Sequence, residues 1–145
     1  MEIYTSYWWQ VRNFPPNLVG LNTVMFPPKY RPFGEDNRGV IVINCPPIVP
    51  NGSCTGLCDG SCLTKRKDCK FLQTYRAQLD KIDFSSFLNS INKLAEKIKK
   101  DKNIEDVDFA LIVFEAPTRE CSERYPLQEW LRAHGFKGEE WKPNN

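Results

Sequence analysis

Two short, unbroken apolar runs constrain the fold of this chain more than any other feature of its sequence. Residues 40–43 read Val-Ile-Val-Ile, and residues 108–115 read Asp-Phe-Ala-Leu-Ile-Val-Phe-Glu. Neither run alternates between apolar and polar residues, so neither suits a strand with one face in water. Continuous runs of this kind are typical of strands in a parallel sheet that is covered on both faces.

Two more segments have the composition of strands, and helical patterns follow them. Residues 3–9 and 18–26 are rich in aromatic and aliphatic side chains, which strands favour. Helical spacing begins at Phe71, and a second helix follows Asp83, a residue type that caps helix N-termini. The apolar face of this second helix is predicted to contain Phe84, Phe87, Leu88, Ile91, Leu94, Ala95 and Ile98.

A last helix and a short tail complete the predicted fold. The helix is expected to have Ser122 as its N-cap, Pro126 in its first turn and Gly135 at its end. Trp141 is expected to pin the polar tail that follows. This order of elements predicts a single α/β domain over residues 1–145, with a small, mostly parallel sheet flanked by helices.

The charge balance and the N-terminal residues narrow the class of protein. The chain has 20 Lys and Arg against 18 Asp and Glu, a formal net charge of +2, and it lacks the run of about 18 apolar residues that spans a membrane. A membrane protein, a coiled coil and a strongly basic nucleic-acid coat are therefore disfavoured. Residues 1–4 lack the basic and apolar regions of a secretory signal, so we expect a cytoplasmic protein.

Cysteines are concentrated in one segment, at about residues 45–70, which is poor in large apolar side chains. Such a segment cannot build its own core, so something else must order it. Cys54, Cys58, Cys62 and Cys69 are separated by three, three and six residues, and four thiolates suit a tetrahedral zinc ion. We predict a structural zinc site in an inserted loop. An iron–sulfur cluster, disulfides and unrelated buried thiols are the alternatives, with Cys45 as a fifth candidate ligand.

A short basic run lies between the third and fourth of these cysteines. It consists of Lys65, Arg66 and Lys67. Positive charges beside a metal loop contact phosphates in nucleic-acid-binding modules. The same charges would also offset the negative charge of four thiolates, and both interpretations stay open.

Polar side chains follow the predicted strands at their carboxyl ends, where parallel sheets bind ligands. Ser6 and Arg12 follow the first strand, and Glu115, Cys121 and Arg124 follow the last. Because a guanidinium matches phosphate oxygens, the two arginines are predicted to hold a phosphate, with Ser6 lining the pocket. Cys121 is a candidate nucleophile at a helix N-terminus and Glu115 a candidate for proton transfer. An inert thiol is the alternative for Cys121.

The two ends of the chain carry motifs that occur together in a known family. Residues 3–7 with Arg12 form the first, and residues 109–117, running through Cys121 to the Gln-Glu-Trp-Leu of residues 128–131, form the second. In these motifs the chain resembles the family known as domain of unknown function 488, although no histidine follows Cys121 as it often does there. The resemblance implies a compact α/β domain with a polar pocket at the strand ends, and nucleotide or nucleic-acid processing.

Two functions from different classes fit these features. The first is the binding or processing of a nucleotide or nucleic acid in the carboxyl-end pocket. The second is a non-catalytic module in which a zinc-ordered loop, with residues 65–67 and the aromatic residues 7–9, contacts nucleic acid or a protein. No membrane partner is expected.

Elemental analysis of protein purified without added metal tests the cysteine prediction. We expect about one equivalent of zinc per chain and a colourless solution. A brown protein with a visible absorption band and bound iron would contradict this result and assign an iron–sulfur cluster instead.

Overall fold

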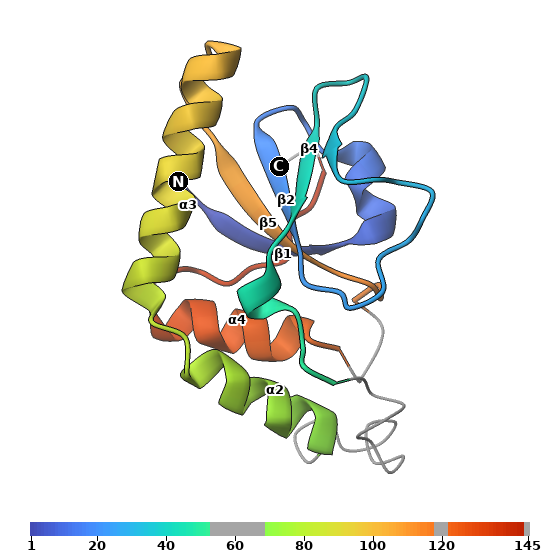
Figure 1. Ribbon diagram of the computed structural model, residues 1–145, viewed down its shortest axis with the longest axis vertical. Coiled ribbons are helices and arrows are strands. Elements are labelled where there is room, and N and C mark those ends of the chain that lie inside the picture. Colours follow the sequence, from blue (N-terminus) through green and yellow to red (C-terminus); the bar gives the residue numbers. More distant parts are fainter. Residues whose placement is uncertain (53–68, 118–121, 144–145) are drawn as a thin grey trace.

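The sheet is small and mostly parallel, as predicted. The computed structural model describes residues 1–52, 69–117 and 122–143. Its strands are β1 (Ile3–Tyr7), β2 (Leu18–Asn22), β3 (Gly34–Glu35), β4 (Ile41–Asn44) and β5 (Asp108–Val113). They form one sheet in the order β1-β5-β2-β4-β3, in which β3 alone runs antiparallel to its neighbour (Figure 1).

β5 lies inside the sheet, between the two strands that come first in the sequence. It pairs with β1 from Ile3↔Phe109 to Tyr7↔Val113, and with β2 over the same length. Phe109, Leu111 and Val113 pack into one apolar core, whereas Ala110 and Ile112 pack into a second core on the other face. This double burial confirms the interpretation of the continuous apolar run.

Three helices cover one face of the sheet. They are α2 (Lys70–Asp80), α3 (Phe84–Lys102) and α4 (Arg124–Ala133), and Figure 1 shows α3 along one side with α4 and α2 below it. Asp83 caps α3, since its Oδ1 accepts from the backbone N–H of Ser85 at 3.1 Å. The N-cap of α4 is Glu123 rather than Ser122, although the Ser122 hydroxyl still accepts from the Arg124 N–H at 3.2 Å.

The opposite face is covered by the 3-10 helix η1 (Trp8–Asn13) and by the C-terminal tail. The expectation of a strand over 3–9 was therefore wrong for its last two residues. The chain turns there because the Trp8 ring is buried and its Nε1 donates to Asn22 Oδ1 at 3.1 Å. Likewise, β2 ends at Asn22 instead of continuing to residue 26, and the Asn22 amide donates to Val24 O.

Trp141 holds the tail as predicted. Its ring meets Phe14 edge-on with 5.1 Å between centroids. Its backbone N–H donates to Thr5 O at 2.8 Å, and the Thr5 N–H donates to Glu139 O at 3.0 Å, so the tail runs along the free edge of β1. Within the described residues, no helix is both long and apolar enough to cross a bilayer.

Gly20 leaves room for a neighbour in the centre of the sheet. A Cβ at this position would lie 2.4 Å from Ile112 Cδ1 and 3.1 Å from Val42 Cγ2. Gly20→Ala is expected to lower the free energy of unfolding by about 1–3 kcal/mol through overpacking, as measured by urea unfolding.

The double variant Gly20→Ala with Ile112→Val provides the control, because valine lacks the Cδ1 atom that obstructs the new methyl group. It is expected to lose less stability than the sum of the two single variants. Additive losses would contradict the packing explanation.

Candidate functional site

A buried network of hydrogen bonds joins the carboxyl ends of β1 and β5 to the tail. Arg124, 2% exposed, donates from Nε to Glu140 Oε1 at 2.7 Å and from Nη2 to Glu115 O at 2.7 Å. Thr5 Oγ1 donates to the same Glu140 oxygen at 2.8 Å, and Gln128 Nε2 donates to Thr5 Oγ1 at 2.9 Å. We call this set the Arg124 network. It fixes α4 and the tail to the edge of the sheet.

Glu123 is the most perturbed acid beside this network. The residue is 8% exposed, and its Oε2, like Arg124 Nη1, has no hydrogen-bond partner among the described residues. Burial, and after it the charge of Glu115, raise the pKa of Glu123 to about 7, and Arg124 opposes the shift. Glu115 itself accepts from the Ser122 hydroxyl at 3.0 Å. A group of this kind exchanges its proton near neutral pH.

The structure brings together only part of the predicted carboxyl-end pocket. Glu115 and Arg124 are in contact. Ser6 is buried, but strand alternation places its side chain on the opposite face from Thr5. Arg12 lines a separate cavity, so the described residues do not form the predicted clamp of Arg12 and Arg124 around a phosphate. Cys121 lies outside the described residues.

The charge of the Arg124 network also disfavours a phosphate. Glu115, Glu123 and Glu140 surround one guanidinium, which already pairs with Glu140. Summed over these described residues, the charge is negative at neutral pH even when Glu123 carries its proton, which disfavours a phosphate. Glu140 was missed by the sequence reasoning, because its position depends on the path of the tail and no local pattern marks it.

A second cluster of charges, the arginine cavity, lies between η1 and the segment that follows residue 29. It encloses about 240 Å³ and is lined by Trp8, Trp9, Val11, Arg12, Tyr30, Arg31, Asp36 and Arg38. Three guanidinium groups face one carboxylate there, which gives a local charge of +2. The predicted binding residue Arg12 therefore belongs to a positively charged site, although a different one from that expected.

Backbone carbonyls hold two of these arginines in place. Arg31 Nη2 donates to Val40 O at 2.9 Å, while its Nε is buried without a partner among the described residues. Arg38 Nη2 donates to Val11 O at 3.1 Å and so ties the segment to η1. The positive charges are consequently fixed by the fold, and Arg31 keeps one unused N–H.

Asp36 organises the same segment. Its Oδ1 accepts from the backbone N–H groups of Arg38 at 2.8 Å and Val40 at 3.0 Å. Its Oδ2 lies 3.7 Å from Arg31 Nη2 and 3.5 Å from Arg38 Nη2. Burial acts to raise the pKa of Asp36, but these backbone bonds and the two arginines outweigh it and hold the pKa below its ordinary value. Asp36 is therefore ionised and leaves the cavity with a positive excess.

Aromatic rings border the cavity and are open to solvent. Trp9 is 60% and Tyr30 66% exposed, and the Arg12 guanidinium lies over the Trp9 ring at 3.2 Å from its centroid. Phe33, 45% exposed, lies 6.4 Å from Trp8 between ring centroids. Large exposed rings beside fixed cations are a known combination for stacking a planar ligand.

Most of the predicted metal loop lies outside the described residues, and so do Lys65, Arg66 and Lys67. This applies to Cys54, Cys58 and Cys62, whereas Cys69 is buried just before α2. Cys45 follows β4, and burial raises the pKa of its thiol to about 11 although the Ile48 N–H acts to lower it. Among residues 1–52, 69–117 and 122–143, no three His, Cys, Asp or Glu side chains gather as a metal site. The zinc site stays a prediction.

Comparisons with protein-family models, curated proteins and solved structures gave no match. The resemblance to the family known as domain of unknown function 488 thus has no support beyond its motifs, and it also stays a prediction. The function is inferred from the geometry of the described residues.

The raised pKa of Glu123 predicts how stability depends on pH. The folded state binds this proton more tightly, so the free energy of unfolding falls as pH rises from about 4.5 to about 7 and the Glu123 contribution is constant above that. At about 1.4 kcal/mol per pKa unit, the loss is on the order of 3 kcal/mol. Glutamine is uncharged at every pH, so Glu123→Gln is expected to remove this pH-dependent loss of stability. Urea unfolding at several pH values measures it.

Glu105→Gln serves as the control, since Glu105 is exposed. It is expected to keep the pH dependence of the parent protein. The explanation fails if both variants show the same slope between pH 5 and 7.

Proposed function

We propose that the arginine cavity binds a nucleotide unit, either free or within a single-stranded nucleic acid. The observation that carries this proposal is the presence of three guanidinium groups and two exposed aromatic rings around one cavity that holds a single carboxylate. The proposal concerns binding alone; processing by Cys121 and Glu115 is not part of it.

The three arginines form the phosphate-binding part of the proposed nucleotide site. Guanidinium N–H groups match phosphate oxygens in pairs, and such charge-assisted bonds are stronger than neutral ones. Arg12 and Arg38 are exposed, whereas Arg31 is held from behind and has an unused Nε–H. The local charge of +2 attracts a phosphate, in contrast to the negative sum of the Arg124 network.

The exposed aromatic rings form the base-binding part of the proposed nucleotide site. Trp9 and Tyr30 line the cavity and are mostly exposed, so a base can stack on either ring without displacing the core. A volume of about 240 Å³ lies below the range of about 300–1,000 Å³ that encloses a whole small ligand. A phosphate held inside with a base stacked at the rim suits these dimensions.

The modest net charge of the chain suits contact with only a few phosphates of a nucleic acid. With three guanidinium groups the site can engage at most about three phosphates, and each released counterion on a single strand contributes a slope of about −0.7 in log K against log salt. A slope near −2 is therefore expected. The predicted basic run Lys65-Arg66-Lys67, if it took part, would make the slope steeper.

Fluorescence anisotropy with a labelled ten-nucleotide single strand tests the proposal. Arg38→Ala is expected to weaken binding about tenfold through the loss of a charged hydrogen bond. Trp9→Ala is expected to weaken it about fivefold or more through the loss of stacking. Lys97→Ala removes an equal charge from the exposed part of α3 and is expected to have little effect.

Competition with unlabelled ligands identifies the form that binds. A mononucleotide that competes as well as the oligonucleotide would identify a single-nucleotide site, whereas a duplex that competes as well as the single strand would contradict stacking. Absence of any affinity at low salt, or equal losses in Lys97→Ala and Arg38→Ala, would overturn the proposal.

A further inference from the structure

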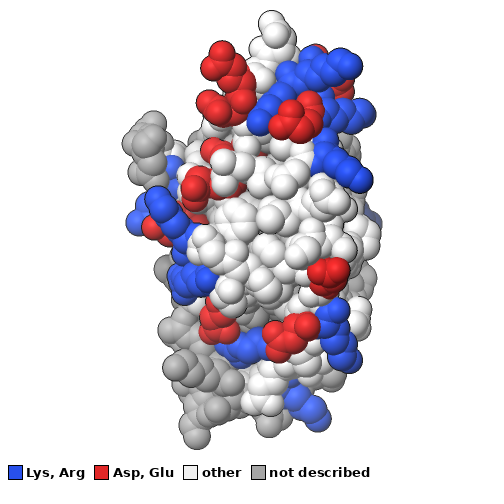
Figure 2. Space-filling view, turned by 90° about the vertical axis from the view of Figure 1, so that its left-hand side faces the viewer, with Lys and Arg blue, Asp and Glu red and all other residues white. Residues whose placement is uncertain are grey.

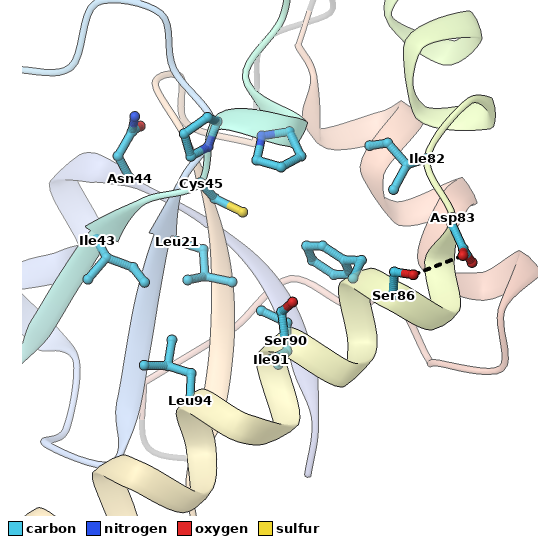
Figure 3. A pocket seen from close by; sticks show the side chains of 13 residues that line it. Leu21, Ile43, Asn44, Cys45, Ile82, Asp83, Ser86, Ser90, Ile91 and Leu94 are labelled. Atoms are coloured by element: carbon cyan, nitrogen blue, oxygen red, sulfur yellow. Dashed lines mark hydrogen bonds between the residues drawn. The ribbon is translucent and has the colours of Figure 1, made fainter.

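The geometry points to a second ligand site, an apolar cavity for a small molecule with an apolar body and a cationic end. The cavity encloses about 420 Å³ where β2 and β4 end, beneath the first half of α3 (Figure 3). Its lining packs on the helical face of the sheet, opposite the face that η1 and the arginine cavity occupy. The inference is independent of the proposed nucleotide site.

The walls of this cavity are mostly hydrocarbon. Leu21 and Ile43 come from the sheet, and Phe87, Ile91 and Leu94 come from α3. The volume lies within the range of about 300–1,000 Å³ typical of small-molecule sites. When an apolar body enters the cavity, both its own surface and the apolar walls are removed from water, and this favours binding.

Cys45 is one of the uncharged polar residues that line the cavity, together with Asn44, Ser86 and Ser90. Figure 3 shows the Cys45 sulfur directed from the end of β4 toward α3. Its thiol carries its proton at neutral pH, since burial raises its pKa to about 11. Cys45 therefore adds a weak donor and no charge.

Asp83 is the one charged residue among the described residues that line the cavity. Its Oδ2 accepts from the Ser86 hydroxyl at 2.9 Å and its Oδ1 from the Ser85 N–H (Figure 3). The bond from the Ser86 hydroxyl, and to a lesser extent that from the Ser85 N–H, lowers the pKa of Asp83. Asp83 is therefore a carboxylate at neutral pH. No described lysine, arginine or histidine lines the cavity to balance it. The charge at the mouth thus selects a cation and repels an anion.

Among the described residues, the stretch of α3 beside the mouth adds no charge. Residues 84–92 of α3 contain no charged side chain. Figure 2 shows that the centre of the face that carries α3 has few charged side chains, and that charges of both signs lie above it, below it and along the left side of the view. Among the described residues that line the cavity, a ligand therefore meets Asp83 as the single charged group.

Two probes of nearly equal size and opposite charge, 4-phenylbutylamine and 4-phenylbutyrate, test this inference by isothermal titration calorimetry. The amine is expected to bind about fivefold more tightly, the upper end for an exposed ion pair. Asp83→Asn is expected to abolish this preference, and asparagine keeps the helix capped because it is an equally good N-cap residue. Equal affinity for both probes in the parent protein would overturn the charge assignment.

A tryptophan placed in the mouth tests the location. Ser90 is an exposed residue of α3 that lines the cavity, and the neighbouring Asn89 is exposed without lining it. Ser90→Trp is expected to weaken binding of the amine at least tenfold, whereas Asn89→Trp is expected to leave it unchanged. Circular dichroism verifies that both variants are folded.

Three further results would decide whether the apolar cavity is a small-molecule site. Failure of both probes to bind the parent protein, or equal binding by Ser90→Trp and Asn89→Trp, would overturn the site. Sedimentation that shows a dimer which the amine dissociates would assign the cavity to a second copy of the chain instead. Arg38→Ala is expected to leave amine binding unchanged, which separates this site from the arginine cavity.

Discussion

The insertion of β5 between β1 and β2 is the interaction on which the rest of the structure depends. β5 pairs with β1 over residues 109–113 and with β2 over residues 108–112, and it packs into both cores. Without it, β1 would have no partner in the sheet, and the groups at the ends of β1 and β5 would not meet. The fit requires small residues: Gly20 lies opposite Ala110 in the register, and the Ile112 side chain fills the space above Gly20.

The sheet separates two environments that suit different ligands. On one face η1, bent back by the buried Trp8, meets the segment of Arg31 and Arg38 and fixes cations beside exposed rings. On the other face the capped end of α3 stands over the ends of β2 and β4 and encloses hydrocarbon beside a lone carboxylate. The described linings of the two cavities therefore carry charges of opposite sign.

The sequence predicted the elements that local patterns determine and missed the contacts that distant segments create. The apolar run at 108–115, the spacing of apolar residues in α3 and the cap at Asp83 are all local signals. The helix and its cap were confirmed, and the strand was confirmed for residues 108–113. The pairing of Glu140 with Arg124 depends on where Trp141 anchors the tail. No spacing rule encodes such a contact, because the two residues meet only after the tail has packed.

The arginine cavity is another site whose contacts between distant segments could not be predicted from local sequence patterns. Arg12 was singled out, but Arg31 and Arg38 join it through bonds to backbone carbonyls and through Asp36, which no motif marks. The expected partnership of Arg12 with Arg124 assumed that polar residues after β1 stay at the carboxyl edge. The turn into η1 carries Arg12 away from that edge, because the Trp8 ring is buried against the sheet.

The path of the tail has a consequence for association between molecules. An unpaired outer strand offers its backbone to other chains and promotes aggregation. Here the N–H and carbonyl of Thr5 in the outer strand β1 are already taken by Glu139 and Trp141, and β3 at the other edge has only two residues. The segment that blocks the edge also carries the carboxylate that neutralises Arg124. Release of the tail would therefore expose a strand edge that can pair with other chains and break the ion pair of the buried Arg124 in the same event, which couples solubility to electrostatic balance.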